Sequence, residues 1–264
     1  MDGAVSLPDG LTPRPLTADN MDAVFDLIVE CERAASGVAD VNVHPEYEGL
    51  GIGSWLLAWT EQRSRQLGRR TVGQTLDDSH RSAATLLQRN GYGYGHTSWI
   101  LEIAMPARPR EPELPDGIAV RSFVPGVDDH ATYRVVEDAF NEWSNREPAT
   151  FEEWAALTIG RRDFEPALLQ LAIDGDRVVG VVFSIDYPED GGWVHQVAVA
   201  ATHRHRGIAR ALLMRAFATS WDRGDRTCGL STDTRTGALG LYEKVGMTVT
   251  RSFTNRVKRL EPVG

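Results

Sequence analysis

The chain has 264 residues, an apolar fraction of 42% and a formal net charge of −9, as expected of a globular protein with one large domain or two smaller ones. The negative charge argues against nucleic acid as a general partner, because phosphate backbones select basic surfaces. Two cysteines, Cys31 and Cys228, are too few for a disulfide framework and lack metal-ligand spacing, so we expect no metal site. The sequence shows no signal-peptide pattern and no apolar run of roughly 18 residues, so we expect a cytoplasmic protein without a membrane partner.

In the first half of the chain, we expect a short strand at 13–16, a helix at 22–35 and a strand that begins at Val41. Three glycines follow this strand at alternate positions: Gly49, Gly51 and Gly53. Alternate glycines after a strand also occur in dinucleotide-binding turns. The third glycine of that fingerprint would fall on Ser54, and no acidic residue follows about 20 positions later, so a dinucleotide site is the weaker interpretation.

The segment from Met105 to Pro115 carries four prolines and several charges, the composition of an extended linker. We place a domain boundary in this segment. The predicted division is a first domain at 1–105, a linker at 106–116 and a second domain at 117–264.

After the linker, the expected order is a strand, two helices and two strands. The predicted elements are a strand at 118–123, a helix at 129–140, and two strands at 167–173 and 177–187. Thr150, with Glu153 three residues later, is a capping-box pattern that opens a further helix. The sequence Asp174-Gly-Asp joins the two later strands and is a hairpin signal.

The stretch from Val194 to Met214 is typical of a strand, a short cationic loop and an amphipathic helix. Gly207 and the small Ala209 allow a ligand to approach the backbone. The first helical turn offers unpaired N–H groups with the positive end of the helix dipole behind them. Arginine forks, which suit phosphate oxygens, surround this turn: Arg204, Arg206 and Arg210. We therefore expect an anion site for phosphate.

Two motifs carry a family resemblance. Arg204-x-x-Gly207-x-Ala209 resembles the Q/R-x-x-G-x-G/A signature of the GCN5-related N-acetyltransferases (GNAT), whose loop backbone holds the pyrophosphate of acetyl-coenzyme A. One helix and one strand later, the segment from Ala238 to Met247, which contains Tyr242, is similar to the family's A-x-x-L-Y-x-x-x-G-F segment. The resemblance implies an α/β (α+β) fold with a mixed, mostly antiparallel sheet flanked by helices, and acetyl-coenzyme A as co-substrate without a metal.

The chain contains two versions of this unit. Residues 41–57 align with 197–213 at a constant offset of 156, so that Gly51 falls on Gly207 and Gly53 on Ala209. Such self-similarity indicates a tandem repeat of a whole domain. The layout resembles the tandem acetyltransferases of the mycothiol synthase type. The first copy is truncated by about one helix and a strand hairpin, so it lacks the material for a complete sheet of its own.

The first copy also departs from the family at two chemical positions. Glu48 stands where the signature has Gln or Arg, and Leu87 stands where the second copy has Tyr242. We expect a non-catalytic half. It is either a weak coenzyme A site or a plain scaffold.

Acetyl transfer to an amine requires that the ammonium group lose a proton and that the leaving thiolate gain one. The family match assigns the second task to Tyr242. The alternative is a core residue with a satisfied hydroxyl, because Ala238, Leu241, Tyr242 and Val245 form an i, i+3, i+4, i+7 stripe.

The base is less directly indicated. Many relatives carry a glutamate early on the central strand, where this chain has Trp193. Strand alternation places His195 on the face of Trp193, Val197 and Val199, and His-Gln-Val-Ala-Val resembles the His-x-x-Ala-Val of arylamine-type acetyltransferases. His195, with an ordinary pKa of about 6.5, is the candidate base. A partly buried structural histidine and deprotonation by solvent are the alternatives.

By the same resemblance, the central strand holds the pantetheine arm and the loop holds the phosphates. The expected cofactor-binding residues are Val197, Ala198, Val199, Arg204, His205, Arg206, Gly207, Ile208, Ala209 and Arg210. Arg235 stands near the place of a family asparagine and either reaches the phosphates or faces water.

The acceptor is expected at 141–154, where carboxylates and indoles suit a cationic or sugar-like amine. A solvated helix with core aromatics is the plainer alternative. We expect an N-acetyltransferase that acts through its second half on a primary amine of a small molecule, as a monomer or homodimer. The competing hypothesis is a catalytically silent coenzyme A-binding or regulatory protein, because the glutamate is missing and the first copy is incomplete.

Overall fold

The computed structural model describes residues 43, 45–142, 148–187 and 191–261. The elements expected at 13–16 and 22–35, and the strand start at Val41, lie outside these residues. The chain divides into two compact units, one that runs to Trp99 and resumes at Arg251, and one that comprises Ile100–Thr250. Within the described ranges, no helix is long and apolar enough to cross a membrane.

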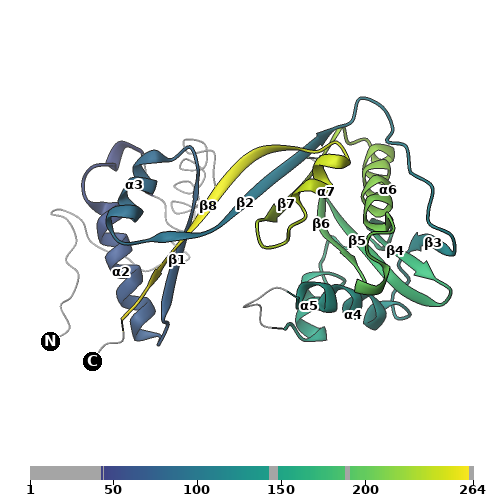
Figure 1. Cartoon of the computed structure of the whole chain (residues 1–264), viewed down its shortest axis with the longest axis horizontal. Coiled ribbons are helices and arrows are strands. Elements are labelled where there is room, and N and C mark those ends of the chain that lie inside the picture. Colours follow the sequence, from purple (N-terminus) through teal and green to yellow (C-terminus); the bar gives the residue numbers. More distant parts are fainter. Residues whose placement is uncertain (1–42, 44, 143–147, 188–190, 262–264) are drawn as a thin grey trace. The chain divides into compact units, whose positions relative to one another are not determined.

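The described strands form a sheet in the order β1-β8-β2-β7-β6-β5-β4-β3 (Figure 1). They are β1 (Thr71–Asp77), β2 (Gly93–Ala104), β3 (Ile118–Ser122), β4 (Leu169–Asp174), β5 (Arg177–Tyr187), β6 (Gly191–Val199), β7 (Thr227–Asp233) and β8 (Thr248–Arg259). The helices are α2 (Ile52–Gln66), α3 (Arg81–Arg89), α4 (Asp129–Phe140), α5 (Phe151–Leu157), α6 (Ile208–Arg223) and α7 (Leu239–Lys244), with 3₁₀ turns η2 (Pro45–Tyr47), η3 (Pro166–Leu168) and η4 (Ala201–His203). β6 and β7 run parallel, whereas β1 with β8 and the pairs from β3 to β6 are antiparallel. The expected mixed, mostly antiparallel sheet is confirmed.

In the first unit, a strand from the end of the chain completes the sheet. β8 pairs antiparallel with β1, from Phe253 opposite Asp77 to Arg259 opposite Thr71, and it lies between β1 and β2. The core beneath the helices consists of Leu57, Val72, Leu76, Leu87, Tyr92 and Leu260. The sheet of the first unit therefore includes a strand from the far end of the sequence.

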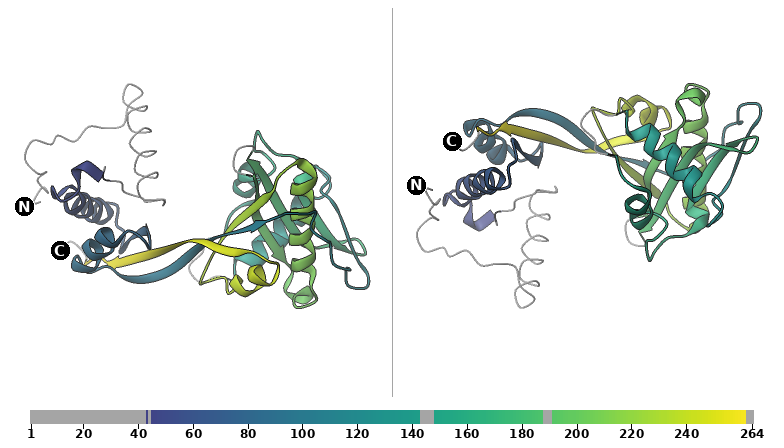
Figure 2. Two further views of the ribbon diagram at one scale, coloured as in Figure 1. Left: turned by 90° about the horizontal axis from the view of Figure 1, so that it is seen from above. Right: turned by 90° about the horizontal axis from the view of Figure 1, so that it is seen from below.

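In the second unit, helices cover both faces of the sheet, as Figures 1 and 2 show. On one face, α6 packs so closely that a Cβ atom at Gly180 of β5 would lie 3.0 Å from Leu212 and 3.1 Å from Ile208. On the other face, α4 and α5 form a core with the strand side chains that point away from α6. This core includes Val136, Trp154, Leu171, Val181, Phe183 and Ala198.

Several local predictions are confirmed in the second unit. Helix α4 has the predicted bounds. Thr150 caps α5, since its Oγ1 accepts a hydrogen bond from the Glu153 N–H (3.2 Å) and Glu153 Oε2 accepts one from the Thr150 N–H (2.8 Å). The β4–β5 hairpin closes with Asp174 opposite Arg177, and Gly175 supplies the positive φ of 57° that the turn requires.

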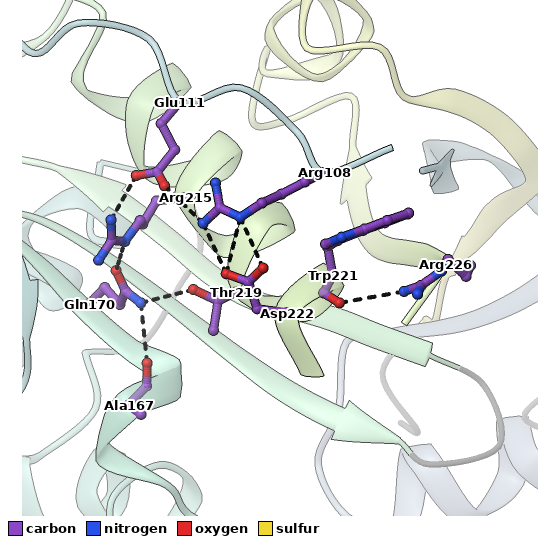
Figure 3. A network of polar contacts seen from close by, with 9 residues as sticks. All are labelled: Arg108, Glu111, Ala167, Gln170, Arg215, Thr219, Trp221, Asp222 and Arg226. Carbon is purple, nitrogen blue, oxygen red and sulfur yellow. Dashed lines mark hydrogen bonds and ion pairs between the residues drawn. The ribbon is translucent and has the colours of Figure 1, made fainter. Parts of the chain in front are cut away.

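The proline-rich segment at 106–116 lies within the second unit, and its side chains contact α6 (Figure 3). Arg108 donates to both carboxylate oxygens of Asp222, with Nε–Oδ1 and Nη2–Oδ2 distances of 2.9 Å. Arg215 donates to Glu111 (2.8 Å) and, through Nε, to Gln170 of β4 (3.1 Å). Exposed pairs of this kind contribute little to stability. A domain division at this segment remains a prediction.

Candidate active site

Two parallel strands separate at the centre of the second unit. β6 and β7 are paired at Gly192 with Cys228 and at Trp193 with Gly229, and within the described residues the ladder goes no further. Both strands nevertheless continue, to Val199 and Asp233 respectively. The fork between them exposes the backbone edge of β6 from residue 194 onward. An extended ligand could bind this edge as an added strand.

The loop between β6 and α6 has the backbone expected of an anion site. His205 and Gly207 both have positive φ, 61° and 86°. The first helical bond runs from Ala211 N to Gly207 O (3.0 Å), so the N–H groups of Ile208 and the two residues after it point beyond the helix end. A Cβ atom at Gly207 would have no neighbour within 4 Å. Open space in front of free amides fits a diphosphate.

The three arginines of this loop differ in their surroundings. Arg204 is anchored: its Nε donates to the Val199 carbonyl (3.1 Å) and its Nη1 to Glu142 Oε2 (2.6 Å). The bond from Arg204 holds the pKa of the Glu142 carboxyl below its ordinary value. Arg206 and Arg210 are exposed to solvent. An anion at the loop would therefore meet these two side chains first, while Arg204 supports the loop from the strand side.

His195 lies just beyond the fork, at a β-bulge. Phe183 pairs with Gln196 and Ser184 with Val194, so His195 is the extra residue of β6. Its ring stands edge-on to Phe183 at 5.6 Å between centroids. Val197 pairs instead with Val182 on the opposite face. The predicted shared face of His195, Val197 and Val199 is thus wrong, because the bulge shifts the alternation by one residue.

The environment of His195 favours its neutral form. Desolvation by the packed side chains, followed by the positive charge of Arg161, lowers the pKa of the imidazole from its ordinary value. The residue as a whole remains exposed to solvent. Arg161 is held in place by Asp163, with Nε–Oδ1 and Nη2–Oδ2 distances of 2.9 and 2.7 Å. A neutral imidazole that water can reach is able to accept a proton.

Tyr242 lies beside the other arm of the fork. The residue is only 7% exposed, and its phenol forms a hydrogen bond with Thr232, three residues past the last paired residue of β7. Burial raises the pKa of the phenol, and the bond from Thr232 partly opposes this shift. Tyr242 is therefore protonated at neutral pH.

The two candidate residues approach the fork from opposite faces of the sheet. By strand alternation, Thr232 shares the face of Cys228, whose thiol contacts Ser220 of α6. His195 lies on the other face, against Phe183. Burial raises the pKa of the Cys228 thiol to about 12, so this cysteine is not a nucleophile.

Two further positions bear on the predicted chemistry. The Trp193 ring covers Gly229, where a Cβ atom would lie 2.8 Å from the indole, so a large residue fills the place of the family glutamate. Arg235 is paired with Asp233 (Nη2–Oδ2 2.5 Å) and its side chain is 52% exposed. The expected acceptor segment at 141–154 lies partly outside the described residues, which omit 143–147.

The first copy repeats the loop backbone without its chemistry. Gly49 and Gly51 have φ values of 78° and 83°, close to those of His205 and Gly207. Glu48 lies 3.5 Å from His80, and Leu87 is buried in the core of the first unit. Across both units, no group of three or more described His, Cys, Asp or Glu side chains is arranged to hold a metal ion.

The comparison with known proteins agrees with this geometry. The family model described as Acetyltransferase (GNAT) family matches residues 26–92 and 130–247, one segment in each half of the chain. The chain belongs to the GNAT family. This GNAT protein is an acetyl-coenzyme A-dependent N-acetyltransferase of the tandem type.

Relatives of this GNAT protein include the mycothiol acetyltransferase of Pseudarthrobacter chlorophenolicus, 31% identical over 89% of this chain and 73% of the relative. That of Arthrobacter sp. is 30% identical over the same shares. The crystal structure of a GCN5-related N-acetyltransferase from Sphaerobacter thermophilus is similar with a TM-score of 0.83 and 31% identity, covering 97% of this chain and 98% of that one. A tandem GNAT protein from the clavulanic acid biosynthesis pathway shares the fold at a TM-score of 0.63 and 12% identity, over 84% of this chain and 74% of its own.

Sequence reasoning missed two features of the site. The bulge at His195 depends on the register with β5, which no motif encodes. Arg161 follows α5 in a short loop, and nothing near it in the sequence indicates that it lies close to His195.

Proposed function

We propose that the second half of this enzyme, residues 117–264, transfers the acetyl group of acetyl-coenzyme A to a primary amine of a small molecule. The observation that carries the proposal is the fork between β6 and β7, with a loop of free amides at its end. The first copy retains the loop conformation but has Leu87 at the place of Tyr242. The chemistry is therefore assigned to the second half.

Acetyl-coenzyme A supplies the acetyl group as a thioester. Residues 204–210 would hold its diphosphate, through the backbone of Gly207 to Arg210 and the exposed guanidinium groups of Arg206 and Arg210. The backbone of Val197, Ala198 and Val199 would hold the pantetheine arm along the open edge of β6. These contacts fix the position of the thioester relative to the fork.

Tyr242 is the proposed acid. In the overall transfer, the amine nitrogen bonds to the acetyl carbon, the carbon–sulfur bond breaks, and the sulfur leaves as a thiolate. The protonated phenol gives its proton to that sulfur, and the second proton, which the attacking nitrogen loses as the amide forms, returns to the phenolate through solvent. Burial keeps the proton on the phenol at neutral pH, so the phenol can donate it as the carbon–sulfur bond breaks.

His195 is the proposed base. Its lowered pKa leaves the imidazole neutral at physiological pH, so that it can take the ammonium proton of the acceptor directly or through one water molecule. The exposed position at the bulge admits that water. Because Thr232 and His195 face opposite sides of the sheet, the two proton transfers take place on opposite sides of the thioester.

The acceptor is proposed to be a small amine near the α4–α5 face, where His195 and Arg161 lie. The mycothiol acetyltransferases among the relatives are named for a small molecule. Trp193 at the place of the family glutamate argues for a different arrangement around the acceptor. We therefore assign the class, a primary amine, and not one compound.

Release of free thiol from acetyl-coenzyme A, measured with a panel of primary amines that includes the acceptor of a mycothiol acetyltransferase, tests the proposal. We expect at least one amine to raise the rate well above the blank. Gly207→Glu should abolish cofactor binding in calorimetry. Binding without release for every amine would support the silent coenzyme A-binding protein, and one full site surviving in Gly207→Glu would assign the cofactor to the first copy.

A further inference from the structure

A buried histidine precedes the phosphate loop and uses both ring nitrogens. His203, at the end of η4, is 8% exposed. Its Nδ1 lies 2.8 Å from Thr202 Oγ1, and its Nε2 lies 3.0 Å from Asp174 Oδ2. The His203 backbone N–H donates to the Ala200 carbonyl (2.8 Å). Two side-chain hydrogen bonds and one backbone hydrogen bond therefore fix the position of His203.

The partner of His203 belongs to a rigid part of the fold. Asp174 ends β4, where it pairs with Arg177 across the hairpin and with Ile118 of β3 on the other side. The carboxylate thus projects from a backbone held between two strands. Through His203, the hairpin is connected to the start of the loop that leads into α6.

The loop needs such support because its backbone is strained. His205, two residues after His203, is the described residue other than glycine with a positive φ, at 61°. Conformations of this kind are unfavourable for residues other than glycine and persist only where the surroundings fix them. Arg204, bonded to the Val199 carbonyl, is a second anchor on the same side. Helix α6 holds the other end of the loop.

We propose that His203 and Asp174 act as a positioning pair for the phosphate loop and set its affinity for the diphosphate of coenzyme A. The inference rests on the proposed binding of acetyl-coenzyme A at this loop. Neither residue needs to touch the cofactor. The pair keeps the amides of Gly207 to Arg210 in the binding arrangement before the ligand arrives, which lowers the free-energy cost of ordering them.

The position of Asp174 also allows the opposite effect. The bond with His203, aided by the positive charges of Arg206 and Arg177, lowers the pKa of the Asp174 carboxyl. An anion near Arg206 would compete with a diphosphate for that guanidinium. Removal of Asp174 therefore weakens cofactor binding if the pair positions the loop, and tightens it if the carboxylate acts mainly as a competitor.

Calorimetric titration of the full chain with coenzyme A decides whether Asp174 positions the loop or competes with the diphosphate. We expect Asp174→Ala and His203→Ala each to raise Kd about tenfold, and the double variant to be no weaker than either single one. Asp176→Ala is the matched control, because it removes an exposed carboxylate from the same turn. Its Kd should stay within about twofold of the wild type, as is usual for an exposed charge. A lower Kd in Asp174→Ala, or an unchanged Kd in both variants, would overturn the proposal.

A kinetic comparison separates positioning from general destabilisation. With acetyl-coenzyme A, the variants should show a higher KM and a kcat close to that of the wild type. With S-acetylpantetheine, which lacks the diphosphate, kcat/KM should be unchanged. An equal loss with both substrates would show that the pair is merely structural. Absence of coenzyme A binding by the wild type would instead refute the proposed function.

Discussion

Substitution of the glycine that opens α6 tests the phosphate loop with a built-in control. Gly207 and Gly224 cap the two ends of the same helix, with φ of 86° and 110°. A Cβ atom at either position would have no neighbour within 4 Å. Alanine at each site therefore introduces backbone strain without a clash, at a cost of about 1–2 kcal/mol. For a chain of this size, both variants should melt about 2–8 °C lower.

Cofactor affinity should separate the two variants. The methyl group of Gly207→Ala would occupy the open space before the free amides, so we expect Kd for coenzyme A to rise at least about tenfold, or 1.4 kcal/mol. Gly224→Ala lies at the opposite end of a 16-residue helix and should bind as the wild type does. Calorimetry and thermal unfolding on both proteins give the comparison. An equal loss of affinity in both, or none in Gly207→Ala, would refute the assignment of the loop.

Three further predictions concern the proposed chemistry and the core. Tyr242→Phe should lower kcat about 10²-fold with unchanged Kd for coenzyme A, and wild-type turnover would remove this phenol from the mechanism. The neutral form of His195 is the active one, so kcat/KM should rise with pH through the lowered pKa of the imidazole. Arg161→Gln removes a positive charge, which should raise that pKa and move the rising part of the pH–rate profile to higher pH. An unchanged profile would contradict the role of His195. Leu212 is fully buried in α6, so Leu212→Ala should lower the free energy of unfolding in urea by about 2–5 kcal/mol. The control Val249→Ala, at an exposed site, should change it by less than about 0.5 kcal/mol. A loss in Leu212→Ala as small as that of the control would contradict the tight packing against Gly180.

The features that sequence predicted well are encoded within a few residues. The side chains of Thr150 and Glu153 each accept a hydrogen bond from the other residue's backbone N–H, so these two residues were enough to predict the start of α5. Gly207 supplies a backbone conformation that other residues rarely adopt, and the loop around it followed from this single requirement. The elements expected at 118–123, 129–140 and 177–187 correspond to β3, α4 and β5, whereas no strand was predicted where β8 lies.

The features that sequence did not predict depend on distant segments. The bulge at His195 exists because Ser184 of β5 pairs with Val194 and Phe183 with Gln196, a register that neither strand specifies alone. The bonds from Arg108 and Arg215 to Asp222 and Glu111 arise from the packing of the proline-rich segment on α6. Composition indicated only an extended segment there.

The final strand, β8, contributes residues to both units, which limits how either end of the gene can be shortened. Thr248 to Thr250 belong to the second unit, and Arg251 onward belong to the first. Deletion of the early part of the gene would strip β8 of its hydrogen-bonded neighbour β1 and leave an unpaired edge open to aggregation. Loss of the late part would remove the middle strand from between β1 and β2. Both ends of the gene are therefore needed for the sheet of the first unit, because β8 from the end of the chain pairs there with β1 from its first third.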